Sequence, residues 1–346
     1  MENTSRERRT PRRMFSVLAA FGVLLATVAL TAPLAGAAVS KCQAANLTQG
    51  TKASPNLQAL IDAASPGNTI QVKGLCMGPF TIAKSLTLFG KPTKDVPHPT
   101  LDGGYNASTK PSPGPVVRVG AGISVAIRDL TIQHGAYPCT DTNQTLECDT
   151  GGIFNAGALT LTRVAVRDNI GSGIGNYEVA GPASLSLTDS LVTGNHCQFH
   201  GGGILTSSGT VTLTRTLVTG NQADLDAGGI SVAVGAVSVT LNDSEVSHNI
   251  AGDQGGAIWN GADLIVNGTT TIAHNTATTD GGGIFNFKGS IGSFTFDGTV
   301  TLNDSSSVSG NTAGHDGGGI FNDAGTVTLN DSSSVSGNHP DDCVFC

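Results

Sequence analysis

The chain repeats one pattern along most of its length, and this repeat constrains the fold more than any other feature. The fourteen residues Gly298–Asn311 (GTVTLNDSSSVSGN) recur unchanged as Gly325–Asn338. A shorter step, in which Asn follows Val or Ile by three positions, recurs at intervals of 26, 26, 28, 26, 36 and 27 residues. Periods of this length are typical of solenoids, in which each coil packs only on its neighbours. The step ends at Asn169, Asn195, Asn221, Asn249, Asn275, Asn311 and Asn338.

Apolar residues form three columns when successive repeats are aligned. The residues between them are mostly Thr and Ser, and this period of two predicts strands with one face inward. The composition agrees, because 47 glycines and 5% aromatic residues suit tight turns and a narrow core. We therefore predict an all-β solenoid with three parallel strands in each coil. The columns are Ile153, Ile174, Ile204, Ile230, Ile258, Ile284 and Ile320; Leu159, Leu161, Leu185, Leu187, Leu213 and Leu329; and Val166, Val192, Val218, Val246, Ile272, Val308 and Val335.

Residues 1–37 have the pattern of a secretory signal peptide. Five arginines are followed by the apolar run Val17–Leu30 and by Ala35–Ala37, a cleavage site of small residues. Arg12–Phe15 also resembles a twin-arginine signal, although an ordinary secretory signal with a long basic start fits equally well. No second apolar stretch follows, so we expect a secreted or cell-surface bacterial protein whose mature chain has no transmembrane segment.

The rest of the chain divides into three parts. Residues 38–75 are expected to form an N-terminal cap, in which the pattern of Asn56–Ala64 predicts an amphipathic helix. A helix there would protect the strand edges of the first coil. Residues 76–338 are expected to form the solenoid and residues 339–346 a cysteine-containing tail. The long interval before Asn311 predicts an enlarged turn at Phe285–Thr299.

Several segments resemble known repeat proteins. Leu57–Val72, Ser85–Gly90 and Leu101–Gly103 resemble the opening of right-handed parallel β-helix proteins of the pectin-lyase-like superfamily. The coils containing Gly255–Ile258 (GGAI) and Gly281–Asn286 (GGGIFN) are similar to the GGAI and FxxN repeats of polymorphic outer-membrane proteins. The resemblance implies a right-handed parallel β-helix with an N-terminal capping helix. It implies little about activity, because one fold hosts many functions.

Charge is distributed unevenly along the chain. Residues 136–346 carry 20 acidic and 4 basic side chains, a net charge of −16. Such a surface repels the phosphates of nucleic acids and anionic membranes. We therefore expect no nucleic-acid partner.

The chain has seven cysteines, and export would permit disulfides. Their spacing favours the local pairs Cys42–Cys76, Cys139–Cys148 and Cys343–Cys346, although the spacing alone leaves other connectivities open. Cys197 is the seventh cysteine.

The recurring Asn residues are interpreted first as structural. Amides stacked at a solenoid turn bond to one another and to backbone groups that the turn would otherwise bury without partners. A polar binding strip is the alternative interpretation.

An acidic column precedes the isoleucine column by four residues. We favour a turn role, in which each carboxylate accepts a hydrogen bond from a backbone N–H two residues later. Two other roles stay open: Asp253, Asp280 and Asp316 as ligands of Ca²⁺, and Asp226, Asp280 and Asp316 as catalytic carboxylates. Lyase chemistry also needs a base, and residues 136–346 hold few basic side chains. The column consists of Asp149, His200, Asp226, Gln254, Asp280 and Asp316.

Two further surfaces could bind ligands. Trp259, Phe285 and Phe321 each follow a column isoleucine, so strand alternation points them outward, where they could stack on sugar rings. The enlarged turn could instead fold over these rings and bury them. Thr-x-Thr pairs, from Thr160/Thr162 to Thr326/Thr328, are similar to the face of ice-binding solenoids.

The favoured function at this point is an exported scaffold that binds carbohydrate or a partner surface, without catalysis. A polysaccharide lyase or glycoside hydrolase that uses the acidic column is the alternative, and ice binding is a second one. Ca²⁺ is the one candidate cofactor, and the oligomeric state stays open.

Overall fold

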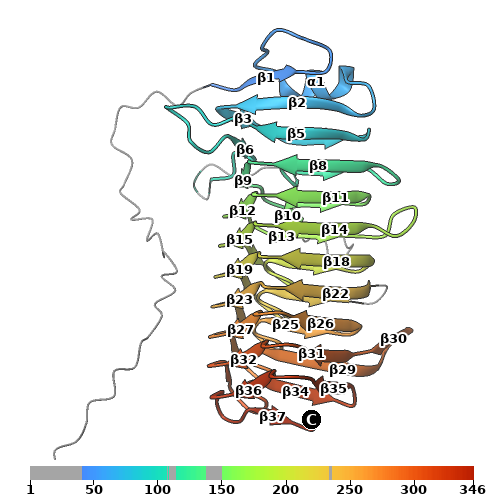
Figure 1. The fold of residues 1–346 in the computed structure, drawn as a ribbon, viewed down its shortest axis with the longest axis vertical. Helices are drawn as coiled ribbons and strands as arrows, with labels where there is room; N and C mark the ends of the chain where they lie inside the picture. Colours follow the sequence, from blue (N-terminus) through green and yellow to red (C-terminus); the bar gives the residue numbers. More distant parts are fainter. Residues whose placement is uncertain (1–40, 107, 109–113, 138–149, 234–235) are drawn as a thin grey trace, which may run out of the picture. The chain divides into compact units, whose positions relative to one another are not determined.

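A computed structural model describes residues 41–346 except 107, 109–113, 138–149 and 234–235. The expected signal peptide, the pair Cys139–Cys148 and Asp149 lie outside the described residues. Residues Val39–Cys346 form one compact unit, in which strands stack along the chain direction (Figure 1). The described part contains one α-helix, α1 (Leu57–Ala63).

Most strands belong to three long sheets, named here sheets I, II and III. Sheet I contains β1 (Gln43–Asn46), β2 (Asn68–Lys73), β5 (Leu86–Gly90), β8 (Ser124–Arg128), β11 (Ala158–Thr162), β14 (Ser184–Thr188), β18 (Gly209–Thr214), β22 (Ala236–Asn242), β26 (Asp263–Asn267), β31 (Thr299–Leu302) and β35 (Thr326–Leu329). Sheet II contains β4 (Phe80–Ile82), β7 (Val117–Val119), β10 (Thr150–Asn155), β13 (Ser172–Asn176), β17 (Ile204–Thr206), β21 (Ile230–Val232), β25 (Ile258–Asn260), β29 (Ile284–Ile291), β34 (Ile320–Asp323) and β37 (Cys343–Val344), with β30 (Phe294–Asp297) paired to β29. Sheet III contains β3 (Leu75–Met77), β6 (Thr100–Asp102), β9 (Thr131–Gln133), β12 (Ala165–Arg167), β15 (Leu191–Thr193), β19 (Leu217–Thr219), β23 (Glu245–Ser247), β27 (Thr271–Ala273), β32 (Ser307–Ser309) and β36 (Ser334–Ser336).

A fourth, shorter sheet was not expected from the sequence. Its strands have two residues each. Each strand directly follows one of the repeated Asn residues and precedes the Gly-rich turn that leads to sheet II. Sheet IV contains β16 (His196–Cys197), β20 (Gln222–Ala223), β24 (Ile250–Ala251), β28 (Thr276–Ala277) and β33 (Thr312–Ala313). A coil of the middle region therefore visits sheets I, III, IV and II in turn, as β14 to β17 do.

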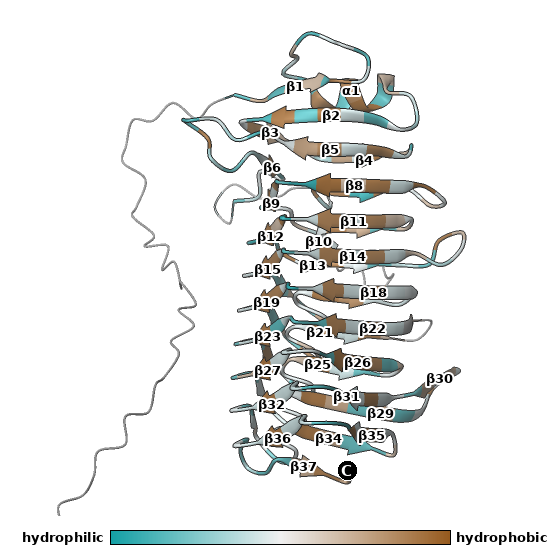
Figure 2. Cartoon of the chain, in the orientation of Figure 1, coloured by the Kyte–Doolittle hydropathy of each residue, from teal (hydrophilic) through white to brown (hydrophobic). Residues whose placement is uncertain are grey.

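Pairing between coils is parallel throughout the described strands, apart from β1 on β2 and β30 on β29. The predicted apolar columns are confirmed by the register, because Ile153 pairs with Ile174, Leu159 with Leu185, and Val166 with Val192. These side chains are buried in one continuous core. Figure 2 shows the resulting apolar stretches along the stacked strands.

The predicted amphipathic helix is confirmed at the N-terminal end of the stack. Asn56 caps α1, because its side-chain oxygen accepts the Ala59 N–H at 3.0 Å. Leu57 and Ile61 are buried, and α1 contacts β1, β2 and β4. The helix and the antiparallel β1 therefore cover the first coil.

The Thr-rich outer face of sheet I breaks at Asp263 and Ile265, as the sequence already indicates, and it also shifts in register one strand earlier. A register irregularity between β18 and β22 places Ser238 beside Thr210 and Thr240 beside Thr212. In the next strand Asp263 and Ile265 stand beside Ser238 and Thr240. The Thr-x-Thr pairs therefore do not form one uninterrupted face.

Candidate functional site

The repeated Asn residues form a buried hydrogen-bonded ladder. The Asn221 side chain donates to Asn249 Oδ1 at 3.0 Å, and Asn249 donates in turn to Asn275 Oδ1 at 3.0 Å. Asn249 Oδ1 also accepts the backbone N–H of Asn221, the preceding ladder residue. The Asn249 amide nitrogen donates in addition to the carbonyl oxygen of Val218. Their amide groups are thus occupied by structural bonds. The ladder, named here the buried Asn ladder, runs through Asn169, Asn195, Asn221, Asn249, Asn275, Asn311 and Asn338.

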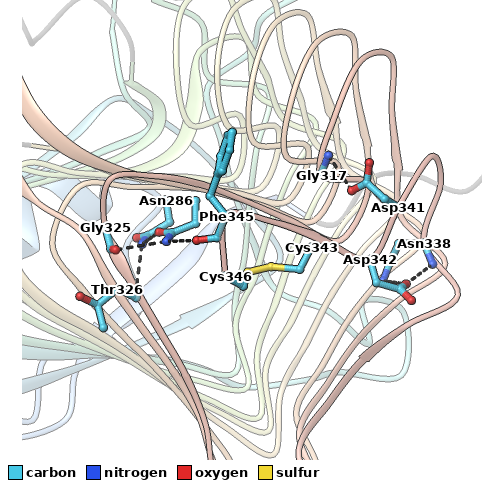
Figure 3. Close-up of a disulfide and its surroundings, with 11 residues drawn as sticks. Asn286, Gly317, Gly325, Thr326, Asn338, Asp341, Asp342, Cys343, Phe345 and Cys346 are labelled. Carbon is cyan, nitrogen blue, oxygen red and sulfur yellow. Dashed lines mark hydrogen bonds between the residues drawn. A yellow bond between two sulfur atoms is a disulfide. The ribbon is translucent and has the colours of Figure 1, made fainter.

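The C-terminal tail closes this ladder (Figure 3). Asp342 Oδ1 accepts both the backbone N–H and the side-chain amide of Asn338, at 2.8 and 3.0 Å. Asp341 Oδ1 accepts the Gly317 N–H at 3.0 Å, and Cys343 and Cys346 form a disulfide. The amide of Asn338 therefore has its acceptor in an aspartate of the tail, where the other ladder amides use an asparagine.

Cys42, Cys76 and Cys197 are absent from the lining of the pocket described below. A disulfide joins Cys42, beside β1, to Cys76 in β3. Cys197 is buried in the stack, and its sulfur accepts the Phe199 N–H at 3.4 Å.

The acidic column bonds backbone groups, but across coils and not within its own turn. Asp280 Oδ1 accepts the Asp316 N–H at 3.1 Å, and Asp226 Oδ1 accepts the Gln254 N–H at 3.1 Å. The Asp253 carboxylate accepts the Thr279 hydroxyl at 2.6 Å. Across the part of the chain that the structure describes, no three His, Cys, Asp or Glu side chains gather as a metal-binding group. Of the three residues named above as calcium ligands, Asp253 and Asp280 thus use a carboxylate oxygen in a bond between turns, and Asp316 contributes its backbone N–H.

The aromatic residues of the outer column are aligned as predicted, but two of them are covered. Trp259 pairs in register with Phe285, and Phe285 with Phe321. The rings of Phe285 and Phe321 are nearly parallel, with centroids 5.4 Å apart. Trp259 is only 8% exposed and Phe285 only 4%, so they do not form an open platform.

The enlarged turn causes this burial. Residues of β29 and β30 pair as an antiparallel hairpin between Lys288–Ile291 and Phe294–Asp297. Phe296 packs edge-on against Trp259, with ring centroids 5.3 Å apart, and Phe287 lies 5.9 Å from the same ring. The hairpin therefore folds over Trp259 and holds its ring in one orientation.

A surface pocket of about 180 Å³ opens between this hairpin and the neighbouring coils. One side is apolar and combines Trp259 with Ile291 and Phe296 of the hairpin. The other side is polar and comes from turns of sheets II and IV. Its lining residues are His200, Asp226, Ser231, Ala233, Trp259, Ile291 and Phe296.

Asp226 and His200 hold the polar side in place. His200 Nδ1 lies 3.1 Å from Asp226 Oδ2, while Asp226 Oδ1 accepts the Gln254 N–H. The Asp226 side chain is 20% exposed and that of His200 is 43% exposed. A carboxylate, an imidazole and Ser231 thus line the same pocket as the aromatic rings. Ser231 pairs in register with Trp259 on the adjacent strand.

The pocket brings together some of the predicted site residues and separates others. Trp259 and Asp226 line it, whereas Asp253, Asp280, Asp316, Phe285 and Phe321 do not. Ile291 and Phe296 were not predicted as site residues. The signal for them was the insertion itself, which carries three phenylalanines, Phe287, Phe294 and Phe296.

A second acid–imidazole pair lies far along the chain from the pocket residues. His134 Nδ1 is 2.9 Å from Asp102 Oδ2. Burial acts to raise the pKa of Asp102, but hydrogen bonds from His134, Gln133 and the Gly104 N–H outweigh it and lower the pKa. The hydrogen bond to Asp102 raises the pKa of His134 against the opposing effect of desolvation. Neither residue of this pair lines the pocket.

Comparison of the chain with protein-family models, with curated proteins and with solved structures found no match. Among the described residues, no helix has the length and apolar character that crossing a membrane requires.

Proposed function

We propose that this protein is an exported carbohydrate-binding scaffold, and that the pocket beside Trp259 holds one sugar unit of a polysaccharide. The observation that carries the proposal is the pairing of an aromatic wall with Asp226, His200 and Ser231. A sugar ring has an apolar C–H face and polar hydroxyls at its edge, and such a wall with a few placed polar groups matches both.

The size of the pocket limits what it can hold. Sites for drug-sized ligands have volumes of about 300–1,000 Å³, and this pocket has about 180 Å³. It suits a single ring, so the rest of a polysaccharide would lie along the surface outside it. Asp226 and its neighbours are acidic, which favours neutral sugars over uronates.

We also infer that the parallel sheets wind as a right-handed β-helix of the pectin-lyase-like type. Parallel strands joined by crossover connections are right-handed in about 98% of cases. The helix α1 at the start of the stack and the GGAI-type coils support the same assignment. Export and a cell-surface location remain part of this proposal and depend on the pattern of residues 1–37.

Binding without turnover is the favoured mode. In the acidic column, the carboxylates of Asp226 and Asp280 each accept a backbone N–H of the next coil. Arg163, Arg167, Arg215 and Lys288, the basic residues after residue 136, are absent from the pocket lining. Release of reducing ends or unsaturated uronates would instead support the lyase or hydrolase alternative.

A glycan array with matched variants tests the proposal. Ile291 is 55% exposed in the pocket wall, so Ile291→Asp should abolish binding without removing a core side chain. Ile250, 49% exposed on β24 and absent from the pocket lining, provides the control Ile250→Asp. Equal binding by both variants, or an array that stays blank, would refute the pocket as a saccharide site.

A further inference from the structure

Two exposed histidines lie beside each other on adjacent coils, away from the pocket. His248 follows β23 and His274 follows β27, and both side chains are exposed. Their ring centroids are 5.3 Å apart and the ring planes are inclined by 38°. The neighbouring coils carry Gly220 and Gly310 at the corresponding position, so the two imidazoles form an isolated pair.

The backbone under both rings is firmly held. Each histidine immediately precedes a residue of the buried Asn ladder, and Asn249 donates to Asn275 at 3.0 Å. The His248 N–H donates to Ala273 O, and the His274 N–H donates to Ser309 O, both at 3.3 Å. Both histidines have left-handed backbones, with φ of 54° and 57°. Their Cβ atoms are therefore fixed relative to each other before any ligand arrives.

Gly310 leaves room for the second ring. A Cβ atom at that position would lie 2.8 Å from Nδ1 and Cε1 of His274. The His274 ring therefore leans over the next coil, which has no side chain to obstruct it. On the other side, Gly220 likewise contributes no side chain beside His248.

We propose that His248 and His274 together bind a divalent transition-metal ion of the Zn²⁺, Ni²⁺ or Cu²⁺ class. Neutral imidazole suits these metals, with metal–nitrogen distances of about 2.0–2.1 Å for zinc. The rings are close enough to share one ion, and rotation about χ2, which is a soft torsion for histidine, directs one nitrogen of each ring to it. Water completes the coordination.

The histidines of the described chain that are paired with a carboxylate show how His248 and His274 differ. His134, His196 and His200 each lie within 3.1 Å of a carboxylate oxygen. A ring nitrogen that bonds a carboxylate must give up that bond before it can coordinate a metal ion. Neither His248 nor His274 takes part in an ion pair of the described residues, so metal binding does not compete with a carboxylate.

The proposal is tested by titrating the purified, untagged protein with NiCl₂ and with ZnCl₂ in a calorimeter. One saturable ion per chain is expected. His248→Gln and His274→Gln should each weaken binding by at least about ten-fold, since even changes outside the ligand shell cost about 10–100-fold at metal sites. His98→Gln and His196→Gln are the controls and should leave the affinity unchanged.

A thermal-melting experiment shows whether the variants are folded. Both glutamine variants should melt within the range of the controls when a chelator is present. Nickel should raise the melting temperature of the natural protein and not of the variants, because a ligand of the folded state stabilises it by mass action. No saturable binding, or binding that survives both substitutions, would overturn the assignment.

Discussion

A ladder asparagine makes hydrogen bonds in two directions along the stack. Asn249 Oδ1 accepts two N–H groups of Asn221, while its amide nitrogen donates to Val218 O and Asn275 Oδ1. These partners are buried, and buried polar groups that lose a partner cost more than the bond itself contributed. At the scale of the residue, this ladder specifies the turn that the coils from Asn169 to Asn338 share.

Replacing one ladder amide should therefore be costly. We expect Asn249→Ala to lower the free energy of unfolding by at least about 3 kcal/mol, because several buried donors and acceptors lose their partner at about 1–3 kcal/mol each. Asn303→Ala is the control, since Asn303 bonds Asn267 and Asn330 in a more exposed ladder. In chemical denaturation, the control should lose less than about 1 kcal/mol of unfolding free energy. Equal losses in the two variants would contradict the structural role of the buried Asn ladder.

The Asp102–His134 pair predicts a pH dependence of stability. The pKa of His134 is raised, so its contribution is fully present below its ordinary value of 6.5 and is lost as the pH rises through the raised value. The pKa of Asp102 is lowered, so its contribution is present above 3.8 and is lost as the pH falls through the lowered value. The pair is therefore most stabilising between these two limits.

His134→Asn removes the titrating partner and keeps a residue that tolerates the left-handed backbone at φ 55°. The melting temperature of the natural protein should exceed that of the variant most clearly near about pH 5 and least near about pH 9. Because the His134 side chain is 41% exposed, the effect should be modest. A difference that does not change with pH would show that the pair has no electrostatic role.

At the scale of the element, charged residues follow strands of sheet I and form a column. Their sign alternates over its first members, which are Asp129, Arg163, Asp189 and Arg215. Arg163 bonds Asp129 with two nitrogens, at 2.7 and 3.0 Å, and Arg215 bonds Asp189 in the same way, at 2.7 and 3.3 Å. The hydrogen bond to Arg215 lowers the pKa of Asp189, and the bond to Asp129 raises that of Arg163. The last two members, Asp304 and Asp331, carry like charges.

Asp331→Arg should place a cation beside Asp304 and so extend the alternation, at the loss of the bond that Asp331 Oδ2 accepts from the Asp304 N–H at 3.3 Å. The position has a left-handed backbone with φ of 55°, close to the 52° of Arg163 and the 47° of Arg215, so the substitution adds no new strain. We expect a small rise in melting temperature that disappears in high salt, because exposed ion pairs are screened. Asp323→Arg makes the same change of net charge at an exposed position and should not reproduce the rise. A larger rise in the control would contradict the pairing argument.

Individual elements show what the sequence could and could not predict. The apolar columns, α1 and the buried Asn ladder follow from period-two alternation, helical spacing and a fixed repeat. A second ladder was missed, in which Asn260, Asn286 and Asn322 bond at 2.7 Å, although an Ile-x-Asn pattern marked it. The pocket was not predicted because its walls come from separate coils and from a hairpin that folds back, and a linear pattern does not show where an insertion packs.

At the scale of the molecule, each coil depends on the one that follows it. Val300, Leu302 and Val308 are fully buried, whereas Val327 and Val335, their equivalents in the identical second copy, are only partly buried and Leu329 is 46% exposed. Amide hydrogen exchange should therefore be faster in Gly325–Asn338 than in Gly298–Asn311, although the fourteen residues are the same. Equal protection of the two segments would mean that the stack opens as a single unit.

Trp259 reports directly on sugar binding in the proposed saccharide pocket, because it is the one tryptophan in the chain and lines that pocket. Its fluorescence should be followed while a polysaccharide that the protein retains on the array is added. The proposed function predicts a saturable change in emission that Ile291→Asp abolishes and Ile250→Asp preserves. Calorimetry should be run in parallel. Saturable binding with no change in the Trp259 emission would place the sugar elsewhere and contradict the proposed pocket.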